Sequence, residues 1–187
     1  MDHLEIEFKS MLTEEEYKNL LPFFQTSKAI TQTNYYIDST GYNLRQAKIV
    51  LRVRTFSDTL AELTLKIPQK LGNMEYNQTL KSTEISNLLE KQIFPEGKIT
   101  QLLEGLSFST NDLRIIGHLE TIRMEKQIEI GLLALDESHY FGKTDFELEL
   151  EVRDFKDGQK QFQSFLKEHH IEYKTGKSKI GRFSENI

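Results

Sequence analysis

Cysteine is missing from all 187 residues of the chain, so disulfide bonds, thiolate catalysis and cysteine-ligated zinc sites are excluded. The sequence also lacks an apolar run as long as a membrane span, and its N-terminus lacks the basic-then-apolar pattern of a secretion signal. We therefore expect a cytoplasmic protein that has no membrane partner.

Positive charge is not in excess either. Lys and Arg total 24 against 29 Asp and Glu, which gives a formal net charge of −5 and argues against general nucleic-acid binding. The sequence has no glycine-rich loop of the P-loop type and no serine nucleophile elbow. The function must therefore be sought in the arrangement of the charged residues along the chain.

Three segments alternate charged and apolar residues, at 5–9, 51–54 and 146–152. Side chains of a strand point to opposite faces with a period of two, so each segment has one ionic face and one apolar face. Carboxylates on one strand face repel each other, so cationic side chains should lie against them. The pattern favours a charged interior. The charged positions are Glu5, Glu7, Lys9, Arg52, Arg54, Glu147, Glu149 and Glu151.

Eight segments rich in β-branched and aromatic residues predict strands, and four amphipathic segments predict helices. Closing eight antiparallel strands into a barrel would remove the exposed sheet edges. We therefore predict a single α+β domain over residues 1–187, an eight-stranded antiparallel β-barrel with a charged lumen and helices packed outside. The expected strands are 4–9, 33–38, 47–56, 60–68, 73–81, 113–124, 126–136 and 145–153, and the expected helices lie near 13–21, 86–89, 98–106 and 159–169.

The expected strand 126–136 contains an irregularity, because its apolar residues before and after Gly131 have opposite parity. A β-bulge at Gly131 would absorb one residue and restore a continuous apolar face. A short turn at Glu125-Lys126 is expected to precede this strand.

Two acidic rows predict a metal site. Glu5 and Glu7 on the first strand, together with acids of the last strand, would form an oxygen-rich site of the kind that Mg²⁺ prefers. The alternative is the solvated face of an edge strand. Which of Glu147, Glu149 and Glu151 would bind the metal stays open.

Basic side chains form the opposite set. Arg52 and Arg54 share one strand face, and Lys66 and Arg123 follow on later strands. Guanidinium groups suit bidentate phosphate recognition, and an ammonium suits a point-charge contact. The alternative is that these residues form salt bridges with the carboxylates. The basic tail with Lys177, Lys179 and Arg182 is either a mobile flap over a ligand or an ordinary solvated terminus.

The first strand, Glu5-Ile6-Glu7-Phe8-Lys9, has the ExExK pattern that resembles the signature of the CYTH superfamily, the triphosphate tunnel metalloenzymes. The resemblance covers nearly the whole chain. Within the superfamily, the sequence is similar to the small bacterial adenylate-cyclase-like members of Gram-positive type. The further matches, in family order, are Tyr35-Tyr36-Ile37-Asp38, Leu51-Arg52-Val53-Arg54, Leu63-Thr64-Leu65-Lys66, Arg123, Leu135-Asp136 and Glu147-Leu148-Glu149.

This resemblance implies a tunnel that binds triphosphate through basic side chains and holds Mg²⁺ or Mn²⁺ on acidic ones. Family members act on inorganic triphosphate, nucleoside triphosphates, RNA 5′-triphosphate ends or thiamine triphosphate, and some cyclise ATP. The implied metal ligands are Glu5, Glu7, Asp136, Glu147 and Glu149. The implied phosphate-binding residues are Lys9, Arg52, Arg54, Lys66, Arg123 and Lys179, and the implied catalytic residues are Lys9, Arg54, Lys66 and Glu149.

Metal-dependent hydrolysis of a small triphosphate-containing molecule is the leading hypothesis, because phosphoryl transfer needs positioning and charge stabilisation rather than a protein nucleophile. The alternatives are adenylyl cyclisation of ATP, non-catalytic binding of phosphorylated metabolites or nucleotides, and a structural barrel with ion-paired walls. The oligomeric state, monomer or homodimer, is left open.

Overall fold

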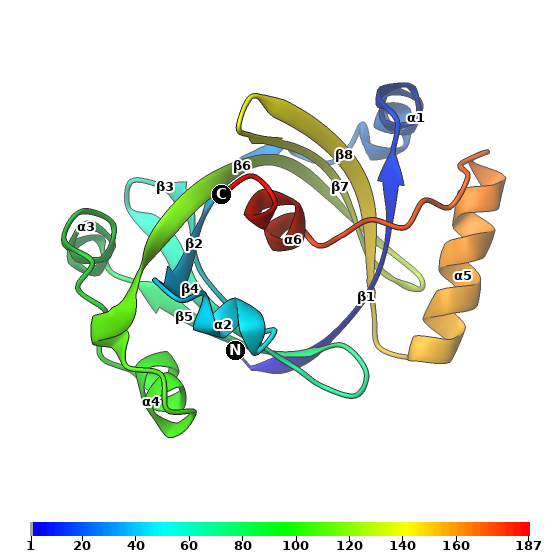
Figure 1. Cartoon of the computed structure of the whole chain (residues 1–187). Coiled ribbons are helices and arrows are strands. Elements are labelled where there is room, and N and C mark those ends of the chain that lie inside the picture. Colours follow the sequence, from blue (N-terminus) through cyan, green and yellow to red (C-terminus); the bar gives the residue numbers. More distant parts are fainter. Residues whose placement is uncertain (1) are drawn as a thin grey trace. The chain divides into compact units, whose positions relative to one another are not determined.

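The predicted eight-stranded antiparallel barrel is confirmed. The computed structural model describes residues 2–187, and its strands close in the order β1-β5-β4-β3-β2-β6-β7-β8 (Figure 1). The strands are β1 (His3–Leu12), β2 (Ile30–Ser39), β3 (Val50–Ser57), β4 (Leu60–Pro68), β5 (Asn73–Leu80), β6 (Leu113–Ile128), β7 (Gly131–Tyr140) and β8 (Lys143–Val152). The α-helices are α1 (Glu14–Leu20), α2 (Asn43–Gln46), α3 (Ser82–Lys91), α4 (Lys98–Gly105), α5 (Phe155–Glu168) and α6 (Lys179–Ser184), and the 3₁₀ helices are η1 (Leu21–Phe24) and η2 (Thr110–Asp112).

The chain forms two compact units, each with its own hydrophobic core. Unit 1 contains residues 2–4 and 32–119, and unit 2 contains residues 5–31 and 120–187. The expectation that residues 1–187 make a single domain stays a prediction.

The core of unit 1 lies on the apolar face of β3 and β4. Leu51 and Val53 of β3 are fully buried opposite Leu65 and Leu63 of β4. The amphipathic helices α3 and α4 bury Leu88 and Leu103, among other residues, in the same core. The charged residues of these strands therefore lie on the other sheet face, as their alternation predicts.

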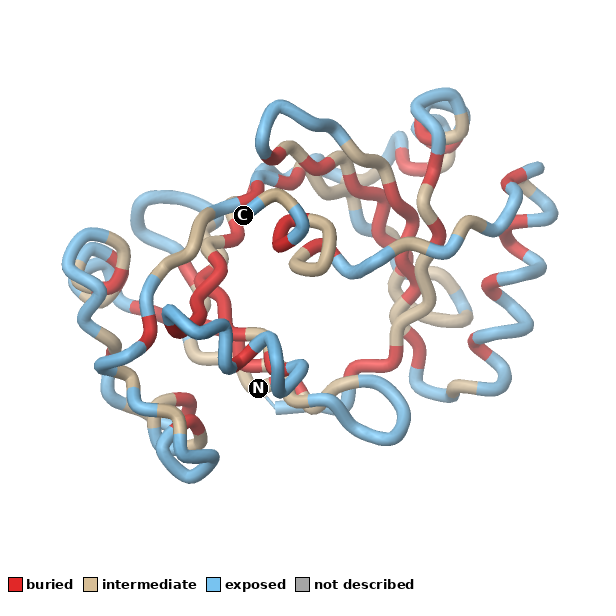
Figure 2. Tube along the Cα trace, viewed as in Figure 1, coloured by how far each residue is buried: buried red, intermediate tan, exposed pale blue. Residues whose placement is uncertain are grey.

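The core of unit 2 lies on the apolar face of β7 and β8 and is covered by α1 and α5. Helix α1 begins with a capping box, in which Thr13 and Glu16 bond reciprocally. Phe162, Phe165 and Leu166 are buried along one side of α5, so buried and exposed residues alternate along this helix (Figure 2). As in unit 1, the ionic strand face is left uncovered by these helices.

The junction of β6 and β7 corrects two predictions. The turn expected at Glu125-Lys126 lies inside β6, which continues to Ile128, and the chain reverses over Glu129-Ile130. Ile128 then pairs with Gly131. This two-residue hairpin resets the parity of the apolar residues, so the β-bulge expected at Gly131 is not needed.

Gly131 is nevertheless a demanding position. Its φ is +159°, and a Cβ there would lie 1.9 Å from the backbone carbonyl oxygen of Glu151. We expect Gly131→Ala to destabilise the protein by roughly 3 kcal/mol, measured by urea denaturation, because neither backbone can move cheaply. Gly105→Ala is the control: a Cβ there meets nothing within 4 Å, so stability should hold or rise. Equal stability of the two variants would contradict this prediction.

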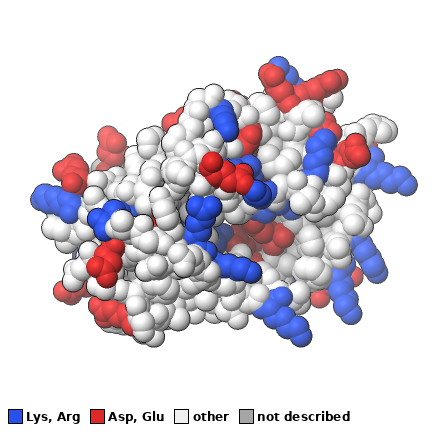
Figure 3. All heavy atoms as spheres, in the orientation of Figure 1, with Lys and Arg blue, Asp and Glu red and all other residues white. Residues whose placement is uncertain are grey.

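The surface carries both charge signs. Figure 3 shows basic and acidic side chains interspersed over the face in view. Within residues 2–187, none of the helices has the length and apolar character needed to span a membrane.

Candidate functional site

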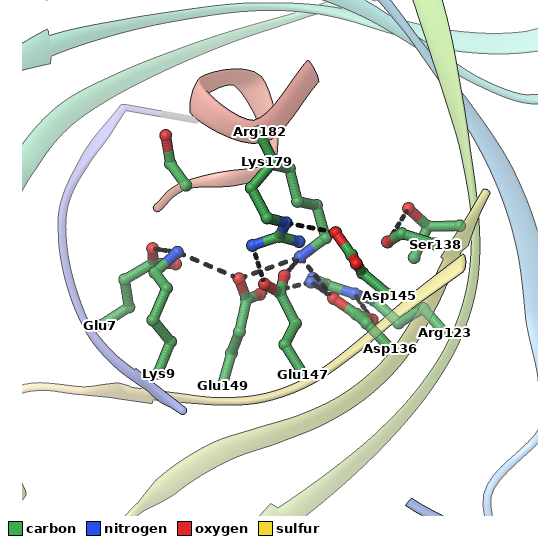
Figure 4. A network of polar contacts seen from close by, with 12 residues as sticks. Glu7, Lys9, Arg123, Asp136, Ser138, Asp145, Glu147, Glu149, Lys179 and Arg182 are labelled. Carbon is green, nitrogen blue, oxygen red and sulfur yellow. Dashed lines mark hydrogen bonds and ion pairs between the residues drawn. The ribbon is translucent and has the colours of Figure 1, made fainter. Parts of the chain in front are cut away.

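Strand register brings the charged residues of unit 2 together on one sheet face. Lys9 of β1 lies opposite Glu149 of β8, and Glu147 of β8 lies opposite Asp136 of β7. Asp136 in turn lies opposite Arg123 of β6. Four strands therefore contribute neighbouring side chains to one polar network, with α6 above it (Figure 4).

Three carboxylates at the centre of this network form a candidate metal centre, which we call the acidic cluster. Asp136, Glu147 and Glu149 are 0%, 1% and 8% exposed, and each offers an oxygen within 4.8 Å of the others. Hard divalent cations such as Mg²⁺ prefer oxygen ligands of this kind. The donor set therefore fits a divalent metal ion.

The β1 acids lie outside the acidic cluster. Glu7 pairs with Lys9 at 2.5 Å, and Glu5 is buried. Lys9 also contacts Glu149 at 3.3 Å, so its ammonium links Glu7 to the cluster. Burial works against that ammonium, yet Glu149 and Glu7 outweigh it and raise the pKa of Lys9 well above 10.5.

Arg123 holds two members of the acidic cluster. Its Nε and Nη2 donate to the two oxygens of Asp136 at 2.8 and 2.6 Å, and Nη2 also contacts Glu149 at 2.5 Å. Burial favours a neutral Asp136, but the Arg123 and Lys179 charges prevail and lower its pKa. Because Arg123 occupies both oxygens, Asp136 is poorly placed to accept a further proton.

Helix α6 supplies two further cations from the chain's basic tail. The Lys179 ammonium contacts Asp136 at 2.7 Å, Glu149 at 3.0 Å and also Glu147. Arg182 pairs with Asp145 and with Glu147, both at 2.8 Å. Burial lowers the pKa of Lys179 well below 10.5, opposed by the Asp136 charge and helped by the Arg123 and Lys9 charges.

The tail is therefore not an ordinary solvated terminus at Lys179 and Arg182. Ser178 caps α6 by accepting a hydrogen bond from the backbone N–H of Gly181, which fixes the start of the helix. Figure 4 shows Lys179 and Arg182 pointing from α6 toward the strand carboxylates. Lys177 differs, because it is exposed and pairs with Glu185.

The predicted basic residues of unit 1 also share one sheet face. Arg54 lies opposite Asn34 of β2, and Arg52 lies opposite Thr64 of β4. Lys66 lies opposite Glu75 of β5. Arg52 is only 8% exposed, so its guanidinium is withdrawn from bulk solvent.

A chain of hydrogen bonds orients Lys66. Its ammonium pairs with Glu75 at 2.7 Å, and Glu75 accepts a bond of 2.7 Å from the amide of Asn77. Asn77 in turn accepts a bond of 2.8 Å from the Thr64 hydroxyl. The salt-bridge alternative considered for the basic residues is thus correct for Lys66, which is at the same time held in a fixed position.

The Lys66–Glu75 pair makes stability depend on pH. Burial favours a neutral Glu75, but Lys66 and Arg52 outweigh it and lower its pKa from 4.5 to about 2. A depressed folded-state pKa contributes stability above pH 4.5 that is lost as the pH falls toward 2, and the shift corresponds to about 3 kcal/mol. Wild type should therefore lose more stability than Glu75→Gln between pH 4.5 and 2 in urea titrations. Glu104→Gln, at an exposed position, controls for the loss of one negative charge. If the free energy of unfolding of wild type and of Glu75→Gln changed with pH in parallel, the prediction would be refuted.

Sequence reasoning missed two polar residues of these networks. Asn34 of β2 accepts a hydrogen bond of 3.1 Å from Arg54, and Asp145 of β8 pairs with Arg182. The alternation along β8 could have pointed to Asp145, which has the parity of Glu147 and Glu149. The position of Asn34 depends on the β2–β3 register, which no single strand encodes.

Comparisons with known proteins agree with this architecture. The CYTH domain family matches residues 3–184. The chain is 39% identical over 184 residues to "Putative triphosphatase YjbK" of Bacillus subtilis, covering 97% of this chain and 95% of that protein. The crystal structure of a putative adenylate cyclase from Bacillus halodurans superimposes with a TM-score of 0.91 at 33% identity, covering 97% of this chain and 98% of the other.

A further solved structure shares the fold at lower sequence identity. A putative adenylyl cyclase from Hippeastrum, described as having a dominant triphosphatase activity, matches with a TM-score of 0.79 and 23% identity, covering 98% of this chain and 96% of that one. The domain match, the 39% identical relative and the closed eight-stranded barrel together identify the chain as a member of the CYTH domain family.

Proposed function

We propose that the protein is a divalent-metal-dependent triphosphatase that hydrolyses inorganic triphosphate or a nucleoside or other organic triphosphate. One structural observation carries the proposal: the buried acidic cluster of Asp136, Glu147 and Glu149 is surrounded by the cations Lys9, Arg123, Lys179 and Arg182. Such a mixture of oxygen ligands and cations suits a metal ion together with phosphate groups. Likeness to the Bacillus subtilis protein supports the same activity.

The acidic cluster would hold the metal, for which we propose Mg²⁺ or Mn²⁺, and Glu5 and Glu7 of β1 are proposed as additional ligands. A bound divalent cation would supply electrostatic stabilisation of the negative charge that grows on phosphate oxygens during the reaction. The Lys179 ammonium now lies against all three cluster carboxylates, so metal binding requires this side chain to move or lose its charge.

The basic residues are proposed to bind the phosphates. In unit 1, Arg52, Arg54 and Lys66 present cationic groups on one sheet face, where they would neutralise the charge of the bound phosphates and orient the phosphate chain. In unit 2 the proposed contacts are Lys9, Arg123 and Lys179.

Hydrolysis needs a water aimed at phosphorus rather than a protein nucleophile. Glu149 is the proposed orienting carboxylate, because Arg123 holds Asp136 through two donors but contacts Glu149 through only one. Lys9, at 3.3 Å from Glu149, would fix the orientation of this carboxylate and is proposed to contact the phosphate. Arg54 and Lys66 would stabilise the charge that develops in the transition state.

Phosphate release tests the activity. Inorganic triphosphate, ATP and thiamine triphosphate are offered with Mg²⁺, with Mn²⁺ or with EDTA, and release is expected with a divalent cation only. Arg54→Ala should lower kcat/KM by about 100-fold, since one preorganised charge contact to the transition state is lost. Arg114→Ala, which removes an arginine that contacts Thr40 in the same unit, should keep full activity. Unchanged turnover in Arg54→Ala would count against the proposal.

Adenylyl cyclisation is the second candidate, supported by the likeness to the Bacillus halodurans structure described as a putative adenylate cyclase. Mass spectrometry of ATP reactions separates the two, because cyclisation yields cyclic AMP and pyrophosphate, whereas hydrolysis yields ADP and phosphate. Triphosphate that raises the melting temperature without any turnover would instead indicate a binding protein. We further propose a cytoplasmic location for the protein.

A further inference from the structure

Two buried hydrogen-bond donors of unit 1 have no partner in the part of the chain that the structure describes. They are Nδ2 of Asn34 and Nε of Arg52, in side chains that are 0% and 8% exposed. An unsatisfied buried donor is destabilising, and native proteins leave few of them. Neither donor contributes to the packing of the core, since both residues lie on the polar strand face. Their presence therefore points to an acceptor that binds from outside the chain.

Arg54 fixes the orientation of the Asn34 amide. A guanidinium has only donors, so Asn34 must turn its oxygen toward Arg54 Nε, at 3.1 Å. The amide NH₂ then faces away from Arg54 and keeps an unpaired N–H. The geometry presents a donor in a defined direction rather than a freely rotating amide.

Strand register places the two unpaired donors near each other. Asn34 is directly opposite Arg54, and Tyr36, two residues further along β2, is opposite Arg52. Asn34 and Arg52 are thus diagonal neighbours on one sheet face, with side chains rooted roughly 7–8 Å apart. One phosphate group, or two adjacent phosphates of a chain, can accept from both.

We propose that Asn34 is a substrate-contact residue whose Nδ2–H donates to a phosphoryl oxygen of the bound triphosphate. Arg54 orients the Asn34 amide for this contact, and Arg52 lies beside it. This inference rests on the proposed function and assigns a neutral donor to its phosphate-binding face. The contact recognises the phosphate chain itself and is shared by every triphosphate substrate. An amide donates a hydrogen bond without carrying a charge. It therefore contributes to phosphate binding and forms no ion pair with the carboxylates of the protein.

Calorimetric titration of inorganic triphosphate in EDTA tests the contact without turnover. Asn34→Ala should weaken binding by about 10-fold or more, the usual effect of losing a hydrogen bond to a charged group. Asn34→Asp is nearly isosteric and can still accept from Arg54, so urea denaturation should show a folded protein at least as stable as wild type. Its carboxylate cannot donate and repels phosphate, so the dissociation constant should rise about 100-fold or more. Gln78→Ala removes another amide of unit 1, whose NH₂ donates to the Glu96 carbonyl, and should bind like wild type.

The outcomes separate this inference from the proposed function. Wild-type protein that neither binds nor hydrolyses inorganic triphosphate, ATP or thiamine triphosphate would overturn the proposed function. Wild-type binding that is retained within about 2-fold in Asn34→Ala would overturn the role of Asn34 alone. Should Asn34→Ala fail to fold, Asn34→Asp decides: undiminished binding by that folded variant overturns the contact, and lost binding with retained stability supports it.

Discussion

Glu149→Gln is expected to reduce triphosphate hydrolysis by at least about 100-fold while the protein stays folded. Glu149 contacts Lys9 at 3.3 Å, Arg123 at 2.5 Å and Lys179 at 3.0 Å, and it is a member of the acidic cluster. Glutamine keeps the size of the side chain but removes its charge. It therefore weakens both the metal site and the proposed orientation of water, two electrostatic terms that are each large in phosphoryl transfer.

Glu151→Gln is the matched control. Glu151 follows two residues later on the same strand, with the same parity, but it is not one of the three clustered carboxylates. Phosphate release at saturating Mg²⁺ should therefore stay within a few-fold of wild type in this variant. If Glu149→Gln retained more than a tenth of wild-type kcat, or if Glu151→Gln lost as much activity, the assignment of Glu149 would be wrong.

Lys179→Met is expected to destabilise the protein strongly in the absence of metal and to increase the stabilisation that a divalent cation provides. In EDTA the variant should lose about 3 kcal/mol, or roughly 6–12 °C in Tm, because three buried carboxylates lose a shared counter-ion. A divalent cation can replace that counter-ion, so Mg²⁺ should restore much of the loss. The gain in Tm on adding Mg²⁺ should consequently be larger in the variant than in wild type, where the ammonium competes with the metal.

Lys177→Met, two residues earlier in the chain, is the control for this experiment. Lys177 is exposed and pairs with Glu185 at the surface, and surface pairs contribute little. Its Tm and Mg²⁺ response should match wild type. A Lys179→Met variant that is as stable as wild type in EDTA, with no added response to Mg²⁺, would show that the ammonium does not compete for the acidic cluster.

The strands and their ionic faces could be predicted from sequence because a period of two is a local property. The same alternation placed Arg52 and Arg54 on one face, and strand register then decided their partners. The turn between β6 and β7 is predicted at the wrong residues, which shows the limit of this reasoning. The turn Glu129-Ile130 lacks the Asn-Gly or Asp-Gly signal by which two-residue turns are recognised.

The candidate site could be predicted only in part, for a related reason. Lys179 meets Glu147 across 32 residues of sequence, and its burial depends on docking of a six-residue helix that has little pattern of its own. The orientation of the Asn34 amide depends on Arg54, which lies 20 residues later in the sequence. Such pairings arise from tertiary packing, so single-strand periodicity cannot reveal them.

The position of α6 after β8 also bears on how the chain is made. The ribosome releases Glu147 and Glu149 well before Lys179 and Arg182, so a nascent chain that ends at β8 carries these acids without two of their four cationic neighbours. The acidic cluster therefore gains its full set of cationic neighbours only when α6 has been synthesised and docked. Until then, a divalent cation of the kind proposed for the acidic cluster would take the place of the absent side chains, and depleting Mg²⁺ should slow maturation of the newly made protein.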